Sequence, residues 1–222
     1  MTLGANGDIS HQMVTYHIPI AARRDPEETK ARILESLADI IVRDGLGAVG
    51  VNTLAREAGA DKVLIYRYFG DLDGVYAAFA EQTDFWWSCR DLIHDIDPAT
   101  TSLSEAIKLC LHRHAAEIRR RPVTLAVLAA EPAARTPLVV VLESVRERRA
   151  LELMAWMGAH YPPTGDLDLE AISVLLSAAI NYLAARSREI RVMSGVPIRT
   201  DEDWLRLSSA IDRIVDGLFE RA

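Results

Sequence analysis

The chain has 222 residues, half of them hydrophobic, and a formal net charge of −7 at neutral pH. This length suits a small unit plus one larger body with a sizeable core. The acidic balance argues against broad affinity for nucleic acid or anionic membranes, so DNA binding would need a localised face. The longest uncharged apolar run, 171–185, is too short to span a bilayer, and we expect a cytoplasmic protein. Cys89 and Cys110 lack metal-ligand spacing, so we expect no disulfide, metal or cofactor.

Residues 1–24 mix Gly, Asn, Ser and Thr without a helical period, and we interpret them as a mobile arm. Arg23 and Arg24 at its end could reach into a DNA minor groove, although a solvated tail is an equally good interpretation. The run Asp25-Pro26-Glu27-Glu28 supplies an N-cap, a proline at the first helical position and acidic residues in the first turn. It predicts a helix over 26–43.

Two short helices are predicted over 51–58 and 62–69, with a break at Gly59. Ala55 is small where two steeply crossing helices must approach closely, and Gly59 tolerates the positive φ of a helix end. Asp61 is placed to accept hydrogen bonds from the free N–H groups that open the second helix. This pattern is typical of a helix-turn-helix, and it predicts DNA as a partner.

The second of these helices presents one face to DNA if Ile65 and Phe69 point inward. At 100° per residue, Val63 and Arg67 then lie on the opposite face, with Tyr66 at its edge. An arginine there can pair with guanine, Val63 can pack on a thymine methyl, and polar side chains at the margins suit phosphate oxygens. The tyrosines could instead simply cap the small core. The predicted DNA-binding residues are Arg23, Arg24, Asn52, Thr53, Lys62, Val63, Leu64, Tyr66, Arg67 and Tyr68.

At these residues the chain resembles the TetR family of transcriptional regulators. The motif A-R-E-A-G-A-D-K-x-x-x-Y-x-Y-F, residues 55–69, combines core, turn and phosphate positions in one order. The resemblance covers roughly residues 25–80. In the rest of the chain, only the length and the helical character are similar to the family. It implies an all-α fold in which a DNA-binding unit is joined by a fourth helix to a larger body. The predicted division is an arm over 1–24, a DNA-binding domain over 25–71, and a ligand-binding and dimerisation domain over 72–222.

Three positions depart from the family pattern. Gly50 stands where Ser or Thr usually caps the second helix, Leu64 where Ser or Thr is common, and Leu72 where Lys often begins the fourth helix. Each change removes a polar contact to the DNA backbone. Residues 23–80 also carry eight Lys and Arg against ten carboxylates. Because phosphate neutralisation normally dominates affinity, we expect modest affinity or a narrow set of operators.

Capping signals and prolines place the remaining helices at roughly 72–95, 103–120, 122–130, 137–160, 168–193 and 201–220, and no alternating β pattern is present. The last two helices carry more apolar stripes than one chain can cover. The resemblance implies dimerisation through them, which would present two recognition helices to a palindromic operator. The predicted dimer interface comprises Leu175, Ala179, Leu183, Trp204, Leu207, Ile211, Ile214 and Leu218.

The resemblance also implies a small-molecule effector bound between the DNA-binding unit and the dimer helices. Aromatic and methionine side chains line many apolar pockets, although ordinary core packing explains such residues equally well. Polar groups inside apolar helices need partners, which adds His112 and Asn181, and Asn181 could instead bond across the dimer interface. The predicted effector contacts are Phe85, Trp86, Trp87, His112, Leu125, Leu128, Met154, Met157 and Asn181.

Two other functions stay open from sequence. An enzyme is disfavoured, because no glycine-rich phosphate loop, nucleophile elbow or isolated carboxylate pair is present, and no catalytic residue is assigned. A TetR-like protein that has lost DNA binding and acts through a protein partner would fit the missing phosphate contacts. We favour a homodimeric regulator, a repressor, that a small and mostly hydrophobic ligand releases from its operator.

Overall fold

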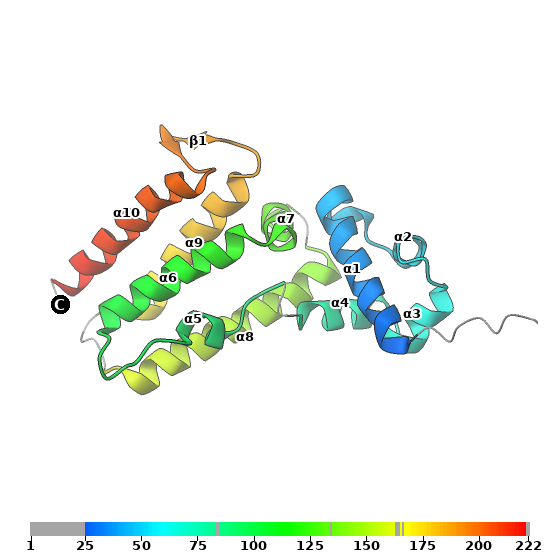
Figure 1. The fold of residues 1–222 in the computed structure, drawn as a ribbon, viewed down its shortest axis with the longest axis horizontal. Helices are drawn as coiled ribbons and strands as arrows, with labels where there is room; N and C mark the ends of the chain where they lie inside the picture. Colours follow the sequence, from blue (N-terminus) through cyan, green and yellow to red (C-terminus); the bar gives the residue numbers. More distant parts are fainter. Residues whose placement is uncertain (1–24, 83–84, 134, 163–164, 166, 221–222) are drawn as a thin grey trace, which may run out of the picture.

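A computed structural model describes residues 25–82, 85–133, 135–162, 165 and 167–220. Within these ranges the chain forms ten α-helices, one 3-10 turn and a hairpin of two strands with two residues each, in the elongated arrangement of Figure 1. The predicted all-α fold is confirmed. A small unit of α1 to α3 lies at one end, and a larger helical body lies at the other.

The small unit consists of α1 (Pro26–Asp44), the 3-10 turn (Leu46–Ala48), α2 (Val51–Glu57) and α3 (Lys62–Phe69). The helix α1 begins where its capping signal predicts, because the Asp25 carboxylate accepts from the Glu27 N–H at 3.0 Å. Its apolar face is fully buried against α2 and α3, where Ile33, Leu37, Leu54 and Ile65 have no exposed surface. One small core therefore holds the three helices together.

The body begins with α4 (Leu72–Ala80), which lies between the small unit and the long helix α8 (Pro137–His160). Three long helices, α6 (Leu103–Arg119), α9 (Leu169–Arg186) and α10 (Asp201–Phe219), lie alongside one another in the rest of the body. The shorter α5 (Cys89–Ile93) packs against α6 and α8, and α7 (Pro122–Ala130) packs against α1 and α9. The helix α7 therefore also touches the small unit.

The predicted helix over 72–95 is wrong. The helix α4 ends at Ala80, and α5 begins at a capping box in which Ser88 and Asp91 bond each other's backbone N–H. Between them, Phe85, Trp86 and Trp87 are all buried, with 2%, 6% and 1% of their surface exposed. Three consecutive side chains of a helix spread over about 200°, so a surface helix cannot bury all of them. A break in the helix lets this tripeptide turn into the core.

The predicted helix over 168–193 is also too long. The helix α9 ends at Arg186, and β1 (Val192–Met193) pairs antiparallel with β2 (Val196–Pro197) before α10 begins. Ser194 and Gly195 both take positive φ, at 48° and 81°, which is typical of a two-residue hairpin turn. Strands of two residues are too short for an alternating pattern to appear in the sequence, so this hairpin could not be predicted from it.

An apolar face of α9 and α10 remains uncovered by the chain itself. On α9, Val174, Leu175 and Tyr182 are 68%, 70% and 57% exposed, and on α10 Leu205 and Ile214 are 69% and 50% exposed. Among the described residues, α9 is the one helix that is long and apolar enough, by length and composition alone, to cross a membrane, and 17% of it is buried. Patches of this kind mark interaction surfaces in proteins.

Candidate DNA-binding interface

The turn between α2 and α3 is held by backbone geometry and by α1. Gly59 takes φ +54°, and the Arg32 guanidinium of α1 donates from Nε to the Ala58 carbonyl at 2.8 Å. The helix α3 then starts at Asp61, whose carboxylate accepts from the Val63 N–H at 2.9 Å. The N-cap of α3 is therefore formed as the sequence predicts, and α3 has a defined start.

One face of α3 is open. Ile65 is fully buried beneath it, whereas Val63 is 67% exposed and Tyr66 is 51% exposed. Lys62 and Arg67 are also exposed, and neither forms an ion pair or hydrogen bond with any described residue. A partner could therefore contact two charged hydrogen-bond donors, one aromatic ring and one aliphatic side chain on this face of α3.

The other predicted DNA contacts are less open. Asn52 is exposed on α2, whereas Thr53, Leu64 and Tyr68 are half-buried. The Tyr68 ring lies 5.8 Å from the Lys30 ammonium of α1, and it lines a groove of about 480 Å³ between α1, α3 and α4. Arg23 and Arg24 lie outside the described residues. The geometry thus gives Tyr68 a packing role, while Tyr66 faces solvent.

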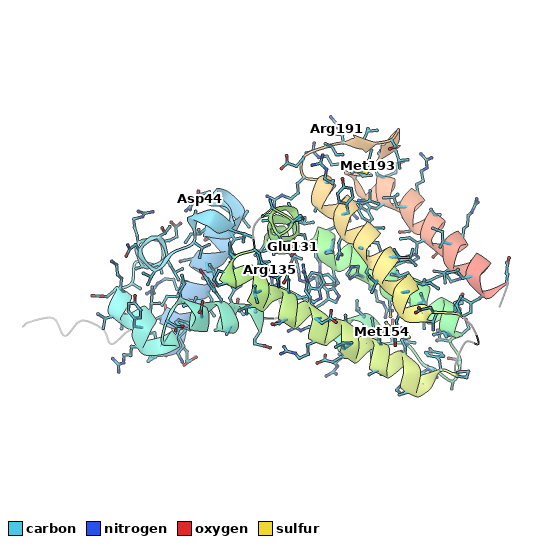
Figure 2. All side chains as sticks on the ribbon, turned by 180° about the vertical axis from the view of Figure 1, so that it is seen from behind. Asp44, Glu131, Arg135, Met154, Arg191 and Met193 are labelled. Atoms are coloured by element: carbon cyan, nitrogen blue, oxygen red, sulfur yellow. The ribbon has the colours of Figure 1, made fainter. Side chains whose placement is uncertain are left out.

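One cation of the small unit, Arg43, is already paired with carboxylates. The Arg43 guanidinium of α1 donates to both oxygens of Glu57, at 2.7 and 3.0 Å, and also to Asp44 beside it. Asp44 is the last residue of α1 and is labelled in Figure 2. These hydrogen bonds hold the pKa of both carboxyl groups below their ordinary values, with a smaller contribution from the charge of Arg56. Arg43 is therefore not free to meet a phosphate backbone, whereas Lys62 and Arg67 of α3 are.

The predicted effector contacts include a stacked aromatic cluster in the body. The Trp86 and Trp87 rings stack with centroids 4.1 Å apart at 19°, and Phe85 lies 6.1 Å from Trp86. The guanidinium of Arg146, on α8, lies 5.5 Å from the Trp86 ring, and it also pairs with Glu131 at 2.7 Å. The cluster therefore joins α8 to the segment that follows α4.

The structure pairs Asn181 with His114, not with His112. The His114 ring, on α6, lies edge-on to Trp87 at 4.9 Å, and its Nε2 lies 2.8 Å from the Asn181 Oδ1 of α9. Burial lowers the pKa of His114 to about 4, so the ring is neutral at pH 7 and donates this bond. Because the two histidines are two positions apart on one helix, the sequence predicts that they point to different faces, but it does not show which of them meets α9.

His112 faces α10 instead of α9. Its Nε2 lies 2.8 Å from the Asp212 carboxylate of α10, beside a groove of about 430 Å³ whose lining includes Arg119 and Trp204. The two histidines thus face different helices, as expected for positions two apart.

The remaining predicted effector contacts are distributed along the body. Leu125 and Leu128 of α7 are buried, as is Met157 of α8, while Met154 is half-buried. Met154 lies in the second half of α8 (Figure 2). Trp156, two residues further on, has its ring stacked on that of His160 with centroids 4.7 Å apart. Ten helical residues separate Arg146 from Trp156, a rise of about 15 Å. The apolar side chains predicted on α8 are therefore well separated from the guanidinium that holds the tryptophan stack.

The predicted interface residues divide into three groups by exposure. Leu175, Ala179 and Ile214 are exposed, and Leu183, Leu207 and Leu218 are half-buried. Trp204 and Ile211 are buried within their own chain, where the Trp204 Nε1 donates to the Ile198 carbonyl at 2.9 Å. The sequence list omits Val174, Tyr182 and Leu205, whose exposure depends on how α9 and α10 pack on α6.

Comparison with known proteins agrees with this architecture. Residues 33–79 match the profile of the bacterial regulatory proteins of the tetR family. An HTH-type transcriptional repressor of Streptomyces coelicolor is 41% identical over 61 residues, which is 28% of this chain and 32% of that protein. The aligned region therefore spans about a third of the length of this curated relative.

Solved structures match over most of the chain. A TetR-family transcriptional regulator from Rhodococcus sp. is 19% identical, with a TM-score of 0.60 over 87% of this chain and 99% of that one. The regulator FadR from Bacillus subtilis, solved in complex with stearoyl-CoA, is 13% identical, with a TM-score of 0.59 over 83% and 96%. The helix-turn-helix region of this chain therefore matches the TetR family of transcriptional regulators, and the chain as a whole has the fold of solved structures of TetR-family regulators.

Proposed function

We propose that this protein is a ligand-responsive transcriptional repressor that acts in the cytoplasm and binds a palindromic operator as a homodimer. The observation that carries the proposal is the open face of α3. Val63, Tyr66 and Arg67 are exposed there, while Ile65 anchors the helix from below. Arginine can read guanine in the major groove, and an aliphatic side chain can pack on a thymine methyl.

The uncovered face of α9 and α10 supports the dimer. Val174, Leu175 and Tyr182 on one helix and Leu205 and Ile214 on the other expose large apolar side chains. A second copy of the chain would cover this face in an isologous contact, since the same patch meets itself across a two-fold axis. We therefore place the interface at these five residues with Ala179 and Leu218, and we leave Trp204 and Ile211 out of it.

Binding of an effector would be transmitted through α4. This helix lies between the small unit and α8 (Figure 1), and the segment after it carries the buried Trp86 and Trp87. A ligand that enters the body and displaces this segment would shift α4 and change the separation of the two recognition helices. It would favour a conformation with low operator affinity.

The effector is proposed to be small and mostly hydrophobic. Most of the candidate contacts in the body are aromatic, leucine or methionine side chains, with His114 and Asn181 as a single polar pair. The structural relative from Bacillus subtilis was solved with an acyl-CoA, which is consistent with an apolar ligand in this fold. Native mass spectrometry of molecules retained by the purified protein would identify candidates.

Selection of bound sequences from a pool of random DNA duplexes tests the central claim. We expect the purified dimer to enrich a palindrome with two equivalent half-sites. A variant with Val63, Tyr66 and Arg67 all replaced by alanine is the control, and it should enrich none. A folded wild-type dimer that enriches no sequence would refute operator binding and favour action through a protein partner.

A further inference from the structure

The helix α4 approaches the recognition helix closely where Gly74 meets the backbone of Phe69. A Cβ built on Gly74 would lie 1.8 Å from the Phe69 carbonyl oxygen and 2.9 Å from its carbonyl carbon, whereas ordinary contacts begin at 3.4 Å. Both obstructing atoms belong to the backbone, so rotation of a side chain cannot remove the overlap. Any other residue at position 74 would push α3 and α4 apart.

Gly74 is not there for its backbone conformation. Gly45, Gly59 and Gly70 take positive φ, but Gly74 lies in the first turn of α4 outside that region. Its N–H donates to the Asp71 carboxylate at 2.8 Å, which fixes the start of α4 beside the end of α3. What the glycine supplies is space for the Phe69 carbonyl.

The carboxyl end of α4, away from Gly74, contacts the body. Val75, Phe79 and Ala80 of α4 are buried, and Glu81, which follows the helix, pairs with Arg148 of α8 at 2.9 Å. Because α4 packs on α8 as well as on α3, the Gly74 contact is a place where the position of the body fixes the position of the recognition helix (Figure 1).

We infer that Gly74 is a positioning residue for DNA recognition: the missing side chain lets α4 hold the carboxyl end of α3 at the spacing that operator reading requires. Tyr66 and Arg67 lie in the last turn of α3, three and two residues before Phe69, whose carbonyl Gly74 contacts. A shift of this turn would displace the side chains that read bases, but it would change little of the positive charge near the phosphates. This inference rests on the proposed function, because it assumes that α3 reads DNA.

The variant Gly74→Ala tests the inference in the full-length dimer. The matched control is Gly158→Ala, since Gly158 lies in α8 with no atom within 4 Å of an added Cβ. The probes are the duplex that wild type enriches from the random pool and an unselected duplex of equal length. We expect Gly74→Ala to reduce the ratio of the two affinities at least tenfold and Gly158→Ala to leave it unchanged. Loss of active protein alone would lower both affinities equally and keep the ratio.

Two further measurements make the outcome unambiguous. All four tryptophans lie outside the small unit, so unchanged tryptophan emission shows that the body of Gly74→Ala is folded. Amide hydrogen exchange over residues 62–70 needs no DNA, and we expect faster exchange in Gly74→Ala than in Gly158→Ala. An unchanged affinity ratio, or unchanged exchange, would overturn the inference. If wild type binds no duplex selectively, the proposed function fails, whereas the exchange result still decides whether Gly74 positions α3.

Discussion

His114 Nε2 lies 2.8 Å from Asn181 Oδ1, and this bond joins α6 to α9 across the core of the body. The two residues are 67 positions apart in the chain. The same histidine lies against Trp87, so one buried imidazole links a core helix, a candidate dimer helix and the segment that follows α4.

Acid should weaken the fold through His114. Its pKa is lowered from 6.5 to about 4 by burial, so between these values the unfolded chain binds a proton that the folded chain excludes. The contribution of the neutral His114 ring to the free energy of unfolding is therefore fully present above pH 6.5. It is lost as the pH falls toward 4, by about 3 kcal/mol at most. Urea unfolding of wild type and His114→Gln across this range measures the effect. The free-energy difference between the two should shrink on acidification, and parallel curves would contradict it.

A charge on the uncovered apolar face should separate the dimer. Leu175→Glu would place a carboxylate in the proposed interface, and leaving it unpaired there costs several kcal/mol. We expect dissociation into monomers at micromolar concentration in sedimentation velocity. The matched control is Leu151→Glu, because Leu151 is 59% exposed on α8, away from this face. If both variants remain dimeric, the interface lies elsewhere.

Arg67 should contribute sequence specificity. Its replacement by alanine is expected to weaken binding to the selected operator by about 1–3 kcal/mol and to relax preference at one base of each half-site. Lys62→Ala is the comparison, since an ammonium at the edge of α3 should lower affinity for operator and unselected duplex alike. Fluorescence anisotropy with both duplexes separates the two behaviours. Equal losses for Arg67→Ala would mean that Arg67 contacts only phosphate.

The salt dependence of operator binding should be shallow. Lys62 is the cation at the edge of α3 that is expected to meet phosphate, and a dimer carries two copies of it, whereas Arg67 is expected to contact a base. At about 0.9 counterions released per phosphate contact, Lys62 predicts a slope of about −2 in a plot of log K against log salt. A titration from low to high salt measures this slope. A slope of about −5 would indicate that Arg23 and Arg24 also reach the DNA.

Much of the DNA-binding unit was predictable because its signals are local. The caps at Asp25 and Asp61 act within two residues, and the break at Gly59 is set by a single φ. The exposed face of α3 follows from helical periodicity once Ile65 is placed inside. Tyr66 and Tyr68 could not be told apart in this way, because the packing of Tyr68 depends on Lys30 of another helix.

The body was less predictable. Apolar character continues through the end of α4, and nothing local distinguishes an aromatic run inside a helix from one that turns into a core. The buried tripeptide over 85–87 is held by distant partners: Thr124 donates to the Phe85 carbonyl, and Arg146 packs on Trp86. Gly74 likewise looks like an unremarkable helical glycine until the Phe69 carbonyl is placed beside it.

The all-α class, the helix-turn-helix and the helix that carries the candidate reading residues follow from local sequence signals, because caps, turns and periodicity act over a few neighbouring positions. The folded structure was needed to show that His114, and not His112, meets Asn181, that Trp204 and Ile211 are buried while Val174 and Leu205 are open, and that Gly74 lies against the Phe69 carbonyl. Those outcomes depend on how helices far apart in the chain pack together, and packing is set by the shapes of many side chains at once.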